Sequence, residues 1–137
     1  MQKRLSGNGG YVWVNGKLLT TLQSVEAKVT GDFEEVKYCG DLSTHHEYQG
    51  WSGEGTLKFG KTDSTVWRLV ANGYKTGNMP DITVNTKLMD LSTGKAERAT
   101  IKQVQITEFF LAQFEAKTPV DEEVPINFSD YKIDEMI

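Results

Sequence analysis

The stretch YVWVNGK, residues 11–17, places four strand-forming residues directly before the dipeptide Asn15-Gly16. Asn-Gly readily adopts the positive φ angles of a two-residue hairpin turn, so this stretch is the strongest local signal of antiparallel pairing in the chain. A return strand is expected from about Lys17. The fold is therefore expected to grow outward from a β-hairpin.

Alternating apolar and polar residues continue the β pattern along most of the chain. Val25, Ala27 and Val29 alternate with charged or polar residues, as in a strand with one buried face. Phe33, Val36 and Tyr38 suggest another strand with a charged face. Further strands are expected near 56–59, 82–88 and 99–106, and two more after Phe109, joined near 119–122. The sequence predicts a mainly β fold, an antiparallel β-sandwich or partly closed barrel of about seven or eight strands.

One segment, residues 63–77, has helical rather than strand periodicity. Its apolar residues at 66, 69, 70 and 74 share one face of a helix. Thr62 or Asp63 can cap the first turn, and Gly77 provides a stop. Gly73 inside this pattern is expected to weaken the helix by about 1 kcal/mol relative to alanine. The prediction is one packed α-helix near 63–76.

Length and charge narrow the function classes. The 137 residues suit one domain, expected to span 1–137, and the net charge of −4 disfavours general binding to a nucleic-acid backbone. Residues 108–137 contribute −6 of that charge and 1–107 contribute +2. The longest apolar stretch, residues 109–112, is too short for a membrane span, and residues 1–10 have no apolar core of a secretory signal. Those ten residues are expected to be a flexible N-terminal arm.

Catalytic and metal-binding signals are weak. His45-His46 is the single histidine pair, with Asp41 and Glu47 nearby. Adjacent side chains on an extended backbone point to opposite faces, so these two imidazoles are not expected to share a metal. The one cysteine, Cys39, forms no internal disulfide or multi-cysteine metal site. No catalytic residue, metal or cofactor is expected, and an enzyme is disfavoured.

The segment Phe33–Gly55 mixes aromatic, histidine, glycine and charged residues. A connection of this length without regular structure is typically functional or disordered, so it is expected to be a long interaction loop. Its aromatic residues either meet a partner or fold back over the core of their own domain. The candidate contact residues are Phe33, Tyr38, Asp41, His45, His46, Tyr48 and Trp51.

Several stretches carry a family resemblance: GYVWVNGKLL (10–19), LQSVEAKVTGDFEEV (22–36), GYKTG (73–77) and FFLAQFEAKTPVDEEVPINFSDYKIDEMI (109–137). Their order and spacing resemble the tail tube proteins of contractile-tailed phages and of PBSX-type defective prophages of Bacillus. The resemblance covers essentially the whole chain and rests on apolar and glycine patterns rather than on catalytic signatures.

This resemblance implies a structural subunit that assembles into stacked hexameric rings. Strands of six subunits would join into a barrel around a lumen that conducts DNA, with the helix outside and a long loop within 33–55 reaching the adjacent ring. The implied partners are copies of the chain itself, the tail sheath, a tape-measure protein and baseplate or terminator proteins. The implied location is the virion tail or a defective prophage particle, after synthesis in the bacterial cytoplasm.

Two other functions remain open from the sequence. A subunit of a type VI secretion-like tube would share the ring architecture and deliver proteins instead of DNA. A β-sandwich carbohydrate-binding module would use Trp13, Trp51 or Trp67 as a stacking platform for sugars.

Overall fold

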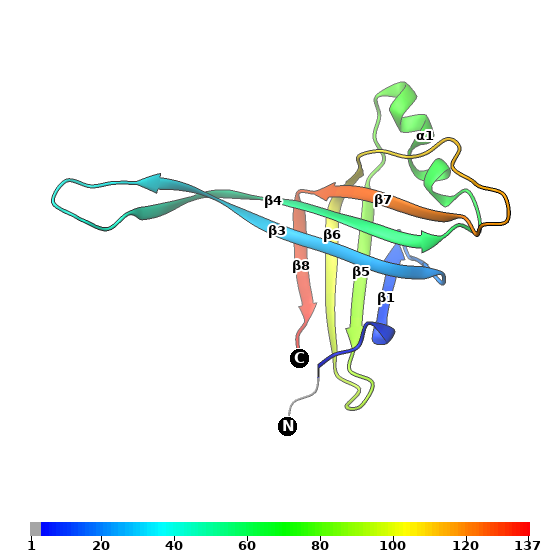
Figure 1. Ribbon diagram of the computed structural model, residues 1–137, viewed down its shortest axis with the longest axis horizontal. Helices are drawn as coiled ribbons and strands as arrows, with labels where there is room; N and C mark the ends of the chain where they lie inside the picture. The colour runs from blue at the N-terminus through cyan, green and yellow to red at the C-terminus, as the bar shows by residue number, and fades with distance from the viewer. Residues whose placement is uncertain (1–3) are drawn as a thin grey trace.

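The computed structural model describes residues 4–137, which hold eight strands, one α-helix and one short 3-10 helix (Figure 1). The elements in chain order are η1 (Gly7–Gly9), β1 (Gly10–Val14), β2 (Lys17–Leu18), β3 (Leu22–Val36), β4 (His45–Gly60), α1 (Thr65–Thr76), β5 (Ile82–Met89), β6 (Ala96–Ile106), β7 (Asp121–Phe128) and β8 (Asp130–Glu135). The mainly β class with one helix is confirmed.

All strand pairs within residues 4–137 are antiparallel, and the sheet that these residues form does not close into a barrel. Its order is β2-β1-β5-β6-β7-β4-β3, and β8 pairs with β6 outside this path. β6 joins two halves, because its residues 96–104 pair with β5 or β8, whereas Gln105 and Ile106 pair with β7. Gln103 has a positive φ of 53°, and the β5–β6 register shifts beside it. This local distortion lies where the sheet passes from one half to the other.

The predicted hairpin turn is present at Asn15-Gly16. Both residues have positive φ, 49° and 84°, and the flanking strands pair Trp13 with Leu18 and Val14 with Lys17. The Asn15 side chain also accepts a hydrogen bond from the Thr83 N–H at 2.9 Å. The turn is therefore stabilised by the backbone preference of Asn-Gly and by the hydrogen bond to Thr83, the second residue of β5.

The helix agrees with its prediction except that it begins at Thr65 instead of Asp63. The Asp63 carboxylate accepts the Thr65 N–H at 3.1 Å just before the first turn, and Gly77 ends the helix with a φ of 80°. Gly73 lies where a Cβ atom would be 3.1 Å from both the Asn78 carbonyl oxygen and the Pro80 ring. Glycine at this position therefore permits close packing of the following chain against the helix.

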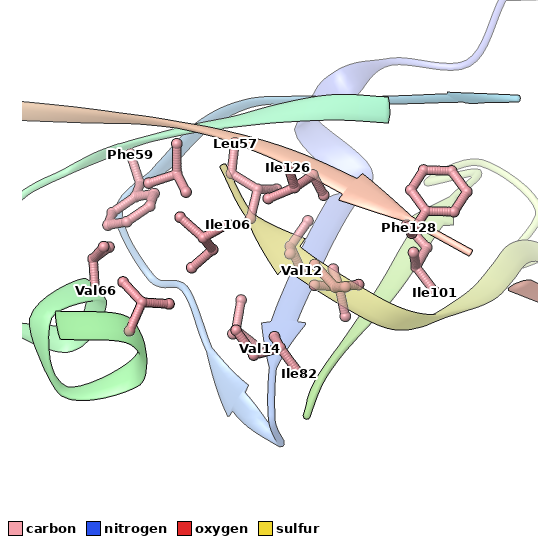
Figure 2. Close-up of a cluster of buried hydrophobic side chains, with 14 residues drawn as sticks. Val12, Val14, Leu57, Phe59, Val66, Ile82, Ile101, Ile106, Ile126 and Phe128 are labelled. Atoms are coloured by element: carbon pink, nitrogen blue, oxygen red, sulfur yellow. The ribbon is translucent and has the colours of Figure 1, made fainter. Parts of the chain in front are cut away.

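The core forms where α1 and the two halves of the sheet meet (Figure 2). β1 and β5 supply Val12 and Ile82, and the helix adds Val70, all at most 1% exposed. The other half contributes residues of β4 and β7, including Phe59 and Ile126. The body is defined here as this core with β1, β5, β6, β7, β8 and α1 around it.

The expected loop from Phe33 to Gly55 is instead mostly strand. β3 continues to Val36 and β4 begins at His45, so only residues 37–44 connect them. Gly53 and Gly55 lie within β4, where added Cβ atoms would come 2.3 Å from the Phe128 ring and 2.2 Å from the Glu26 carbonyl oxygen. These glycines serve close strand packing and not a turn, which is why a glycine-rich segment remains extended.

Two other expectations are revised. Within the expected arm 1–10, residues 7–9 form η1, Gly9 is buried, and β1 starts at Gly10, while residues 1–3 lie outside the described residues. The strand expected just after Phe109 is absent from the described chain. Residues 107–120 have no helix or strand, and the last two strands meet at Ser129.

Candidate assembly surfaces

A two-stranded ribbon of β3 and β4 projects away from the body (Figure 1). β4 pairs with β7 only between Gly53 and Gly60. From the Thr30–Ser52 pair outward, β3 and β4 pair only with each other among the described strands. We define residues 30–52 as the arm. A two-stranded ribbon by itself is marginally stable in water, so the arm is the part of the fold with the least internal support.

One face of the arm is apolar because of a β-bulge. Asp32 lies opposite Gly50 and Phe33 opposite Tyr48, which leaves Gln49 as an extra residue on β4. Without this extra residue, positions 48 and 51 would point to opposite faces. With it, the side chain of Tyr48 lies on the same face as Trp51. The rings of Phe33 and Tyr48 are 5.5 Å apart, and each residue is 59% exposed.

Three of the candidate contact residues, Tyr38, Asp41 and His45, meet at the tip of the arm. His45 Nε2 lies 2.5 Å from an Asp41 carboxylate oxygen, and the rings of Tyr38 and His45 are in edge contact at 5.4 Å. The Tyr38 hydroxyl donates to Glu47 at 2.8 Å. Cross-strand pairing places His46 opposite Glu35. The tip is thus closed by polar contacts between solvent-exposed groups.

Hydrogen bonds shift two pKa values at this tip. The bond to His45, helped by the Ser43 N–H, lowers the pKa of Asp41 below its ordinary value. The bond to the Glu47 carboxylate raises the pKa of the Tyr38 hydroxyl. Residues 34–47 also contain four acidic side chains and one lysine, so the tip is net acidic while both histidines are neutral.

Trp51 occupies the base of the arm and faces its own chain. Its ring packs against Phe128 at 6.1 Å and against Tyr131 at 5.2 Å, and the residue is partly buried against the core. The arm therefore combines an aromatic anchor at its base with exposed aromatic side chains farther out. The contact role predicted for Trp51 toward other chains stays a prediction.

A large apolar groove lies between the base of β3 and the half of the sheet that contains β5, β6 and β8. Its volume is about 810 Å³. The lining includes Val25, Val29, Leu88, Ile101, Tyr131 and Ile133. Of these, Val25, Val29, Tyr131 and Ile133 are between 40% and 54% exposed. The groove was not predicted from the sequence. The alternating apolar residues of β3 and β8 nevertheless indicate that each of these strands has one apolar face, and both faces line the groove.

A second exposed apolar region lies beside the helix in residues 107–120. Phe110, Leu111 and Phe114 are exposed there, while the Phe109 ring packs on Tyr74 at 5.2 Å. Trp67 fixes the backbone of this segment by donating from Nε1 to the Phe110 carbonyl at 3.0 Å. This segment adds a second exposed apolar surface, whose residues do not line the groove.

The described residues contain no metal-binding cluster, and their three tryptophans lie on different elements. No group of three or more histidine, cysteine, aspartate or glutamate side chains in residues 4–137 could hold a metal ion. Trp13, Trp51 and Trp67 lie on β1, β4 and α1, and each contacts different neighbours. None of the helices in the described part of the chain is long and apolar enough to cross a membrane.

Comparisons with known proteins point to one class. Residues 1–135 match the sequence profile of a family described as "Phage tail tube protein". Two proteins of Bacillus subtilis (strain 168) are also similar over 99% of this chain and 94% of their own length. The phage-like element PBSX protein XkdM is 30% identical over 138 residues, and the uncharacterized protein YqbM is 29% identical.

Solved structures share the fold at low sequence identity. The tube-terminating cap of the anti-feeding prophage superposes with a TM-score of 0.77 at 11% identity, covering 99% of this chain and 94% of the cap chain. A chain of the sheath-tube complex of an extracellular contractile injection system has a TM-score of 0.73 at 14% identity, with coverages of 98% and 94%. A chain of a gene transfer agent virion has a TM-score of 0.65 at 10% identity, with coverages of 96% and 99%.

Proposed function

The chain belongs to the phage tail tube protein family, and from that premise we propose that it assembles into stacked hexameric rings that form the tube of a contractile tail. It is a tail tube-like structural protein of the phage and prophage class. The observation that carries the assembly proposal is the arm, whose exposed aromatic face has no cover from its own body. Such a face is typical of a surface that another molecule covers.

The arm supplies the contacts between subunits or between rings. Phe33 and Tyr48 present exposed aromatic surface, and burying such side chains is a common source of interface energy. The tip offers charged and hydrogen-bonding groups for the rim of the same contact. We assign this role to Phe33, Tyr38, Asp41, His45, His46, Tyr48 and Trp51 together.

The other partners follow from the assemblies in which similar folds occur. Chains with this fold are found in a sheath-tube complex, a sheath/tube terminator and a baseplate. The corresponding partners here are a tail sheath, a terminator, baseplate proteins and a tape-measure protein inside the tube. The chain then resides in the tail of a virion or of a defective prophage particle, and is made in the bacterial cytoplasm.

The cargo of the tube is DNA, which passes through the lumen without being held. A chain with net charge −4 has no general attraction for phosphates, and a lumen wall that bound phosphates would retard passage. A tube that delivers proteins is the second candidate, and the fold shared with an extracellular contractile injection system supports it. The two candidates are separated by the genes next to the one that encodes this chain: finding tape-measure and portal genes there would favour the DNA-conducting tail.

The test is negative-stain electron microscopy of the concentrated protein together with its solution mass by light scattering. Hexameric rings or hollow tubes, and a mass of six subunits or multiples of it, are the expected results. A sample that remains monomeric at every concentration, including in the presence of purified baseplates, would contradict the proposal.

A further inference from the structure

We propose that Asn15 is a chemical modification site: it deamidates spontaneously in the folded chain, whereas the other two asparagines that precede a glycine are protected by the fold. In this reaction the backbone nitrogen of the following glycine attacks the side-chain Cγ atom and forms a five-membered succinimide ring. The N–H proton and the side-chain –NH2 group leave together as ammonia. Water then opens the ring, giving aspartate or, when it attacks the backbone carbonyl carbon, isoaspartate. The reaction needs only water, and it is independent of the proposed assembly.

The chain contains three Asn-Gly dipeptides, at residues 8–9, 15–16 and 72–73. Glycine favours ring closure because it has no side chain that hinders the approach of its nitrogen, and because its backbone rotates freely. Since the dipeptide is the same at all three positions, a difference in rate among them in the folded chain comes from their surroundings.

At two of the three positions the attacking nitrogen is held in place. Gly9 is buried, and its N–H donates to the Ser6 carbonyl at 3.1 Å. Gly73 is buried inside α1, where backbone N–H groups donate to carbonyl oxygens one turn earlier. The space around both is tight, since an added Cβ would lie 2.2 Å from the Met89 carbonyl oxygen at Gly9 and 3.1 Å from the Asn78 carbonyl oxygen at Gly73. Each nitrogen must give up a hydrogen bond and a packed position before it can attack.

Gly16 differs from both in having an accessible and mobile nitrogen. Asn15 and Gly16 are exposed, and an added Cβ at Gly16 would have no atom within 4 Å. Within residues 4–137 the Gly16 N–H donates to no backbone acceptor. The strand that follows, β2, has two residues and lies at the end of the sheet, so the turn opens on this side by breaking two strand pairs.

The atom that is attacked is held on the other side of the turn. The Asn15 N–H donates to the Thr83 carbonyl at 2.9 Å, and the Asn15 side-chain oxygen accepts the Thr83 N–H at 2.9 Å. The second bond draws electron density from Cγ and stabilises the negative charge that develops on this oxygen as the Gly16 nitrogen attacks. The electrophile is therefore fixed to β5, while the nucleophile belongs to the side of the turn that moves.

Formation of isoaspartate would add one methylene group to the backbone of a two-residue turn. The turn would then no longer align Val14 with Lys17. Lys17 joins the hairpin to the start of α1, because its Nζ contacts the Asp63 carboxylate at 2.6 Å and the Thr65 hydroxyl at 3.0 Å. We therefore expect the modification to loosen the contact between the hairpin and the helix.

Peptide mapping of the intact folded chain during incubation at mildly alkaline pH tests the proposal. Trypsin gives peptide 5–17, in which fragment ions distinguish Asn8 from Asn15, and peptide 69–75, which contains Asn72. The matched control is the same chain kept unfolded in guanidinium chloride at the same pH, where the three dipeptides are expected to react at similar rates. Folding should slow Asn8 and Asn72 at least about tenfold and leave Asn15 within about threefold of its unfolded rate. Equal slowing of all three, or faster reaction at Asn8 or Asn72 than at Asn15, would overturn the proposal.

Amide exchange gives a second readout, of the consequence for the helix. The isoaspartate form is separated by ion exchange, and freshly prepared Asn15→Asp is its control, because this variant has the same added charge and an unaltered backbone. Exchange at residues 68–70 of α1 is expected to be at least about threefold faster in the isoaspartate form and unchanged in Asn15→Asp. Equal exchange in the two forms would overturn the coupling between the turn and the helix.

Discussion

Val12 on β1 and Phe33 on β3 belong to the same antiparallel sheet, yet Val12 is fully buried and Phe33 is 59% exposed. Val12 has pairing strands on both sides of β1 and packs in the core. Phe33 has one pairing strand and the ring of Tyr48 beside it. The core of the body thus satisfies its apolar side chains internally, whereas the outer arm leaves them for a contact outside the chain.

The largest effect is expected from shortening a core side chain in the body. Ile82 is 1% exposed at the centre of the core, so Ile82→Ala removes buried methyl groups and leaves a cavity. We expect a loss of about 3 kcal/mol in the free energy of unfolding, measured by urea denaturation of the isolated subunit. A loss below about 1 kcal/mol would show that the core is loosely packed.

Trp51 at the base of the arm is expected to contribute to both regions. Trp51→Ala removes the contacts with Phe128 and Tyr131 and should lower the free energy of unfolding by about 2 kcal/mol, less than for a fully buried tryptophan. It should also reduce tube formation, with Trp51→Phe as the conservative control. Undiminished tubes from a destabilised subunit would assign Trp51 to internal packing alone.

The outer arm should separate stability from assembly. Phe33→Ala is expected to change the unfolding free energy of the subunit by less than about 1 kcal/mol, because the ring is mostly solvated. Tube formation, scored by electron microscopy, should fall sharply. Leu91→Ala is a matched control, since Leu91 is equally exposed but lies in the β5–β6 turn. Equal tube yields for the two variants would contradict the role of the arm.

The smallest effect concerns the pH dependence of the tip. The pKa of Asp41 is lowered in the folded chain, so its ionised carboxylate stabilises the tip fully at pH values above the unfolded pKa of about 3.9. This stabilisation is lost as the pH falls through the lowered pKa of the folded chain. Amide exchange at residues 37–44 should therefore accelerate below about pH 4, relative to the intrinsic rate. Asp41→Asn should abolish this dependence, and an unchanged pH profile in the variant would assign it to another group.

Local signals made the hairpin turn and the helix predictable. Asn15-Gly16 and residues 63–77 carry their own backbone preferences, and the chain adopts them. The loop expected over 33–55 is wrong, because two of its glycines, Gly53 and Gly55, accommodate strand neighbours that are distant in the sequence. Gly53 makes room for Phe128, more than seventy residues away, and no local pattern reveals that.

The candidate site was only partly predictable for the same reason. The aromatic and charged residues between Phe33 and Trp51 stood out by composition, and the structure gathers most of them on one arm. The bulge at Gln49, which brings Tyr48 to the face of Trp51, has a local signal in the next residue, Gly50, whose φ is 139°, but this signal is readable only once the segment is known to be strand. The groove depends on bringing β3 beside β8, about a hundred residues later, and only the topology provides that.

Hydrogen exchange of the isolated subunit and of the assembled tube, compared peptide by peptide, reports directly on whether another copy of the chain completes the arm. We expect fast exchange in residues 30–52 of the subunit, strong protection of the same residues in the tube, and unchanged protection of β1 and β5 in the body. Equal protection of the arm in both states would contradict the claim that it is completed by another copy of the chain.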